Sequence, residues 1–104
     1  MYSHELLPEF SPVQSFYKKA VVRADEGMTV LESYTVPVVI LLASGDVLLT
    51  DSWDHSATTL RHVREFLKQN GHIQEAASKA TVMAAIEAGK FTRITREEYE
   101  DLQL

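Results

Sequence analysis

The sequence predicts an α+β domain in which an antiparallel sheet of three or four strands, about residues 15–53, packs against a helix at residues 57–70. Three observations indicate this class. The first half of the chain is rich in β-branched and aromatic residues, interrupted by turn-forming glycines. The second half carries capping residues and apolar residues at helical spacing. A length of 104 residues suits one globular domain and is too short for two.

The amino-terminal segment is expected to form an irregular arm. Residues 1–14 contain two of the three prolines of the chain and show no sustained apolar periodicity. The apolar side chains of this arm are expected to pin it to the body of the protein. A single domain then spans residues 15–104 and begins with a strand at residues 15–24 and a turn at residues 25–27.

An apolar run from residue 28 to residue 44 predicts one long strand or two short ones. Pro37 lies inside this run, and because proline has no amide hydrogen to donate, we expect an edge, a bulge or a break there. Gly45 and Asp46 fit a two-residue turn of the glycine-first kind. The return strand is expected at residues 47–53, which makes the sheet an antiparallel meander.

The helix expected at residues 57–70 has clear boundary signals. Ser56 is a good N-cap, and Gly71 stands where a left-handed residue is favoured after the last turn. Apolar side chains recur along one face, which we expect to lie on the sheet. This face consists of Leu60, Val63, Phe66 and Leu67.

Two more helices are expected in the last quarter of the chain. One covers residues 79–88, and the other covers residues 96–103. Residues 91–94 form a connector or a short strand between them. Thr95 and Glu98 have the spacing of a capping box, in which each side chain accepts a hydrogen bond from the other's backbone amide.

The composition excludes several classes of protein. The absence of cysteine excludes disulfides, thiolate metal sites and cysteine nucleophiles. No apolar run approaches the roughly 18 residues that cross a bilayer, and we expect residues 1–5 not to be a secretory signal. The four glycines are isolated, so no nucleotide-binding loop is present. A net charge of -5 argues against a dedicated nucleic-acid binder, and we expect a cytoplasmic protein without a membrane partner or a cofactor.

Residues 53–62 concentrate the side chains that catalysis and metal binding use, including an aspartate, two histidines and three hydroxyl groups. The spacing does not support a metal site, because His55 and His62 are seven residues apart and no known ligand pattern includes them. We therefore expect no metal and no acid–base pair in this segment.

Ser56 also lacks the surroundings of a serine nucleophile. The glycines that bracket the nucleophile in hydrolases are replaced here by Asp54 and Thr58. Structural roles explain the segment better: Ser56 caps the helix, Asp54 complements the positive end of the helix dipole, and Trp53 anchors the corner between strand and helix. The protein is therefore not expected to be an enzyme.

A basic stripe on the helix at residues 57–70 is the candidate partner-binding surface. Arg61, Arg64 and Lys68 follow the i, i+3, i+7 spacing of one helix face, and His62 lies beside them. These side chains suit an acidic protein surface or nucleic-acid phosphates. The competing interpretation is a solvated face on which Glu65 dilutes the positive field.

Three segments carry a resemblance to a protein family. They read S-F-Y-K-K-A at residues 15–20, L-E-S-Y-T-V-P-V at residues 31–38 and W-D-H-S-A-T-T-L-R-H-V-R-E-F-L at residues 53–67. The chain thereby resembles small uncharacterised proteins encoded in phages, prophages and plasmids of low-GC Gram-positive bacteria. The match covers about residues 15–70. Lys18 stands where the family pattern has glycine, which argues against a special backbone conformation there.

This resemblance implies a setting and no chemistry, since the family has no known function. Small acidic phage proteins are often binders that block or redirect a host protein, including CRISPR nucleases. We therefore expect a non-catalytic protein that binds a host or phage protein, with inhibition of a defence nuclease as the most specific form. The alternative is a small nucleic-acid-associated accessory protein that uses the basic face of the helix at residues 57–70. The sequence leaves the oligomeric state open, with a homodimer as one option.

Overall fold

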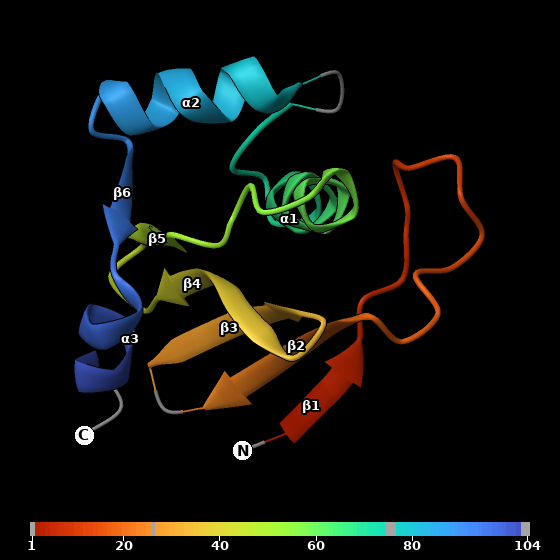
Figure 1. The fold of residues 1–104 in the computed structure, drawn as a ribbon, viewed down its shortest axis with the longest axis horizontal. Helices are drawn as coiled ribbons and strands as arrows, with labels where there is room; N and C mark the ends of the chain where they lie inside the picture. Colours follow the sequence, from red (N-terminus) through yellow and green to blue (C-terminus); the bar gives the residue numbers. More distant parts are fainter. Residues whose placement is uncertain (1, 26, 75–76, 103–104) are drawn as a thin grey trace.

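A computed structural model shows how the chain folds (Figure 1). Three expected features include a residue that the structure does not describe. These residues are Met1 in the arm, Glu26 in the turn, and residue 103 at the end of the last expected helix. The residues described are 2–25, 27–74 and 77–102.

Six strands, within the described residues, form one sheet whose spatial order follows the sequence. Neighbouring strands are antiparallel, except that the last two are parallel. The α+β class is confirmed, but the sheet has more strands than the three or four expected. The strands are β1 (Tyr2–Glu5), β2 (Ala20–Asp25), β3 (Met28–Ser33), β4 (Val36–Leu42), β5 (Val47–Thr50) and β6 (Phe91–Ile94).

The two outer strands, β1 and β6, extend the expected meander at its edges. β1 pairs with β2 from Tyr2 opposite Ala24 to Glu5 opposite Val21, so the expectation of an irregular arm is wrong for residues 2–5. Both prolines of the segment follow β1 and leave its hydrogen bonding intact. Residues 91–94, for which a connector or a short strand was expected, form the strand β6. This strand lies parallel to β5 because α1 and α2 carry the chain back between the two strands.

The strand expected at residues 15–24 begins only at Ala20. A turn precedes it, in which Tyr17 and Lys18 have positive φ angles of 52° and 63°. Lys18 was expected to argue against a special backbone conformation, and its positive φ shows that this expectation is wrong. Hydrogen bonds hold the turn closed, including one from the Lys19 amide to the Phe16 carbonyl at 2.9 Å.

The apolar run at residues 28–44 forms two strands joined by Tyr34 and Thr35, whose φ angles are 52° and 68°. Pro37 lies at a bulge, as its missing amide hydrogen predicts: Glu32 pairs with Pro37 but Leu31 pairs with Val39, which leaves one extra residue on β4. The hairpin therefore bends where its turn approaches the first helix.

Two boundaries of the meander differ from expectation. The connection between β4 and β5 has four residues, 43–46, where a two-residue turn is expected. Gly45 supplies the left-handed position with a φ of 97°. β5 ends at Thr50, and residues 51–54 turn back toward the helix, with the Trp53 amide donating to the Thr50 carbonyl. The last three residues of the expected return strand thus belong to a turn.

The three helices, α1 (Ala57–Gln69), α2 (Lys79–Glu87) and α3 (Arg96–Leu102), lie within one residue of their expected bounds. Ser56 Oγ accepts a hydrogen bond from the Thr59 amide at 3.0 Å, which confirms the N-cap of α1. The capping box of α3 is confirmed by reciprocal bonds between Thr95 and Glu98 at 3.0 and 3.1 Å.

The helices cover the sheet unequally. α1 and α2 lie on one face and α3 lies on the other (Figure 1). On the first face, Val63 and Leu67 of α1 pack on Leu31, Val38 and Leu49 of the sheet. The smaller core beneath α3 consists of Val30, Ile40, Leu48, Ile94 and Tyr99.

Candidate functional site

Buried polar side chains join β3 to the first turns of α1. Ser33 Oγ lies 2.8 Å from His62 Nδ1 and donates a hydrogen bond to Thr59 Oγ1 at 3.1 Å. Thr59 Oγ1 also accepts a hydrogen bond from Ser56 Oγ at 3.2 Å. The direction of the hydrogen bond between Ser33 Oγ and His62 Nδ1 depends on which ring nitrogen of His62 carries the proton.

His62 faces the core, where 1 % of its surface is exposed. The edge of its ring meets the Phe16 ring, with 4.6 Å between the centroids, and Tyr34 lies at 5.9 Å. Burial lowers the pKa of His62, and the neighbouring positive charge of Arg61 acts in the same direction, so that the pKa is about 4. The grouping of His62 with the partner-binding residues is therefore corrected, since this side chain is neutral and enclosed.

The pairing of Ser33 with His62 is a contact that the sequence analysis missed, because 29 residues separate the two. Ser33 and His62 are the residue types of a catalytic nucleophile and its base, but they lack the pKa and the exposure that catalysis requires. A base with a pKa of about 4 removes protons poorly at neutral pH, and Ser33 is 2 % exposed. Among the described residues, no carboxylate is hydrogen-bonded to His62 in the way a catalytic histidine is oriented.

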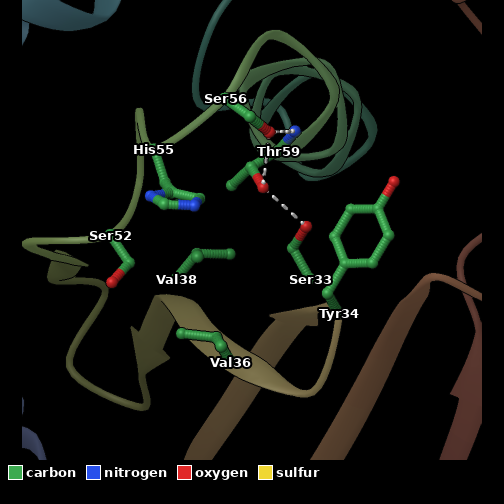
Figure 2. Close-up of a pocket in the computed structure, with 8 residues that line it drawn as sticks. All are labelled: Ser33, Tyr34, Val36, Val38, Ser52, His55, Ser56 and Thr59. Carbon is green, nitrogen blue, oxygen red and sulfur yellow. Dashed lines mark hydrogen bonds between the residues drawn. The ribbon is translucent and has the colours of Figure 1, made fainter.

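A cavity of about 340 Å³, which we call the hydroxyl cavity, opens at the start of α1 (Figure 2). Val36 and Val38 of β4 form its apolar floor. Hydrogen-bonding groups above an apolar floor are the usual lining of a small-molecule pocket. In the parts of the chain that the structure describes, no three His, Cys, Asp or Glu side chains gather to hold a metal ion. The polar side chains on the walls of the hydroxyl cavity are Ser33, Tyr34, Ser52, His55, Ser56 and Thr59.

The sequence-predicted basic residues meet at a second cavity, of about 270 Å³. Arg61 is exposed, Arg64 and Lys68 are half-buried, and the helical spacing turns all three toward this hollow. The opposite wall is the segment from Phe10 to Pro12, between β1 and β2. We call this hollow the basic cavity.

Glu65 holds that wall in place. The competing interpretation of the basic stripe put Glu65 on a solvated face, but Glu65 is 2 % exposed and lies outside any such face. Its carboxylate accepts hydrogen bonds from the backbone amides of Glu9 at 3.0 Å, Phe10 at 3.1 Å and Ser11 at 2.8 Å, and from Gln69 Nε2 at 2.8 Å. Burial alone raises the pKa of Glu65, but the Gln69 side chain and the backbone amides outweigh it, so the net pKa lies below its ordinary value.

One feature of the sequence indicates that Glu65 contacts a neighbouring segment. His62 and Glu65 border the apolar stripe of α1 on the same side, so a polar lining under a neighbouring segment could be inferred. The identity of that segment could not, since its amides lie more than fifty residues away from Glu65.

The remaining candidate residues have structural positions. Trp53 is 3 % exposed and belongs to the main core. Asp54 lies 3.8 Å from Lys79 Nζ, so its ion pair reaches the first turn of α2. An exposed pair of this kind adds little stability.

The fold and the two cavities define a small α+β protein in which residues of α1 line both cavities. Residues 5–84 match the model of DUF8033, described as a family of unknown function, and because this match spans most of the chain the protein belongs to that family. No curated protein and no solved structure matches it. None of the helices described is long and apolar enough to cross a membrane.

Proposed function

We propose that the protein is a non-catalytic binding protein of a phage or another mobile element, and that it acts on a host or phage protein. Its most specific form would be the inhibition of a defence nuclease. The resemblance of three sequence segments to phage and plasmid proteins of Gram-positive bacteria supports the setting. These segments supply residues of both cavities, including Ser33 and Arg64.

The convergence of Arg61, Arg64 and Lys68 on one open hollow carries the proposal. The chain has a net charge of -5, so three cations that share a cavity produce a local field opposite to that of the whole molecule. Such a field attracts an acidic patch on a partner and selects against other surfaces. The low pKa of His62, beside the enclosed Ser33, favours binding over catalysis.

A capture experiment with matched variants tests the proposal. The protein, carrying an affinity tag, is expressed in the host, and the retained proteins are identified by mass spectrometry. The test variant carries Arg61→Glu, Arg64→Glu and Lys68→Glu. The control carries Lys90→Glu, Arg93→Glu and Arg96→Glu, which change the charge equally around β6 and the start of α3. We expect one partner to bind wild type and control equally and the test variant about tenfold less.

Equal recovery of that partner by the test variant would refute a role for the basic cavity. The alternative, a nucleic-acid-associated accessory protein, makes a different prediction. It requires oligonucleotide binding that weakens with salt and that the test variant loses. That result in place of a protein partner would replace the proposal.

A further inference from the structure

Two buried hydrogen-bond donors without partners lie on opposite walls of the basic cavity. Among the described residues, Ser11 Oγ and Arg64 Nε are the buried side-chain atoms that make no hydrogen bond. Both residues line this cavity. A buried donor without an acceptor is destabilising, so the coincidence of two in one hollow indicates a ligand that supplies acceptor oxygens.

The charge of the cavity defines that ligand further. Arg61, Arg64 and Lys68 donate hydrogen bonds and accept none. The carboxylate on the wall, that of Glu65, is already engaged by three backbone amides and by Gln69. The hollow therefore offers donors and positive charge, and the complementary group is an anion.

The wall opposite α1 is held in place before any ligand binds. The segment that follows β1 runs beside α1 (Figure 1), where the Glu65 carboxylate fixes its amides. Gln69 Nε2 also donates to the Leu7 carbonyl at 2.6 Å. A cavity whose walls are already ordered loses less conformational entropy on binding, as a specific site requires.

We propose that the basic cavity binds a carboxylate, supplied by an aspartate or glutamate side chain of a partner protein. The source of the carboxylate rests on the proposed function. A guanidinium group matches the two oxygens of a carboxylate, and about 270 Å³ accommodates one short acidic side chain. A nucleic acid would carry further phosphates over a chain of net charge -5, which repels them. Ser11 Oγ and Arg64 Nε are covered, so these two side chains must turn into the cavity as the carboxylate enters, while Glu65 keeps the backbone of the opposite wall in place.

The side-chain NMR signals of the arginines test this inference directly. Protein with ¹⁵N-labelled arginine is titrated with a hexaglutamate peptide whose termini are blocked, and separately with blocked hexaglutamine. We expect saturable movement of the Arg64 Nε–H signal with hexaglutamate, none with hexaglutamine, and no movement of Arg93, which lies on β6. Unchanged Arg64 signals, or equal movement with hexaglutamine, would overturn the proposal.

Two conservative variants separate a built site from a diffuse positive patch. Arg64→Lys keeps the charge and loses the planar fork, and we expect it to weaken hexaglutamate binding about tenfold. Ser11→Ala leaves every charge in place and is expected to weaken binding about threefold. Full affinity in both variants would show that charge alone attracts the peptide, which contradicts the proposal.

Competition identifies the preferred anion. If inorganic phosphate or a single-stranded oligonucleotide displaces hexaglutamate at a concentration lower than that of the peptide, the site binds phosphates and the inference is overturned. The proposed function can fail on its own. If hexaglutamate moves the Arg64 signal but the captured partner binds the charge-reversal variant as well as wild type, the carboxylate site stands and the proposed function does not. If the partner needs the basic face but hexaglutamate leaves Arg64 unmoved, the carboxylate site fails alone.

Discussion

Thr35 adopts a backbone conformation that β-branched residues rarely take, with a φ of 68° in the turn between β3 and β4. Its side chain is exposed, so the strain is relieved without loss of core packing when the Cβ is removed. Thr35→Gly is therefore expected to raise the free energy of unfolding by about 0.5–1 kcal/mol, measured by urea denaturation.

Thr92 supplies the matched control, because it is an exposed threonine in β6 without a positive φ. Thr92→Gly should lower the free energy of unfolding, since glycine weakens a strand. A similar loss in Thr35→Gly would show that the turn is not strained.

His62 makes folding sensitive to acid. Its pKa of about 4 in the folded protein lies below the ordinary value of 6.5, so the unfolded chain binds a proton more readily. The stabilising contribution is complete above pH 6.5 and is lost as the pH falls to 4. We expect the free energy of unfolding to decrease by about 3 kcal/mol over this range.

NMR titration of the His62 imidazole provides the direct measurement, and denaturation at each pH gives the free energy. His62→Gln should show a flatter pH profile because glutamine does not titrate. A His62 signal that titrates near 6.5 would contradict the enclosed position of the ring beside Ser33.

At the residue scale, the sequence predicted local chemistry well and long-range contacts poorly. Ser56 as a cap needs only its neighbours, and the structure confirms it. His62 and Glu65 are charged or titratable residues on a helix, for which exposure is the ordinary expectation. Their partners come from β3 and from the segment after β1, which the spacing along α1 does not reveal.

At the scale of elements, Glu65 links the segment after β1 to α1 through hydrogen bonds from three backbone amides of that segment. Glu65→Gln places an amide NH₂ group against backbone donors, and we expect it to lower the free energy of unfolding by about 1–3 kcal/mol at neutral pH. Denaturation in urea measures the loss. Glu87→Gln, an exposed substitution on α2, is the control and should have little effect.

The same carboxylate has a second pH signature. Because the folded protein lowers the pKa of Glu65 below 4.5, its contribution is present above that pH and disappears as the pH falls through the folded value. The difference in stability between wild type and Glu65→Gln should therefore shrink in acid. A difference that stays constant from neutral pH to pH 3 would contradict an ionised Glu65.

Helices were easier to predict than strands for a physical reason. The bounds of α1 and α3 follow from local capping bonds, such as those of Ser56 and Thr95, and the apolar stripe. A four-residue edge strand such as β1 depends on the hydrogen bonds of its neighbour β2, so its own sequence indicates little. The late start of β2 has a similar origin, because Tyr17 and Lys18 take a conformation for which glycine is the usual signal.

At the scale of the molecule, the sheet separates opposite charges. The basic cavity lies along α1. α1 packs on one face of the sheet, and acidic α3 packs on the other (Figure 1). Under the proposed function, this separation would orient the protein during an encounter, with α1 toward an acidic partner surface. The acidic residues of α3 are Glu97, Glu98, Glu100 and Asp101.

A structure of the complex with the captured partner tests the central claim most directly. We expect a partner aspartate or glutamate in the basic cavity, its carboxylate oxygens about 3 Å from the Arg64 guanidinium group. Ser11 should lie within hydrogen-bond distance of the same carboxylate. An interface that leaves the basic cavity open to solvent, and that uses α3 or the outer strands instead, would contradict the account.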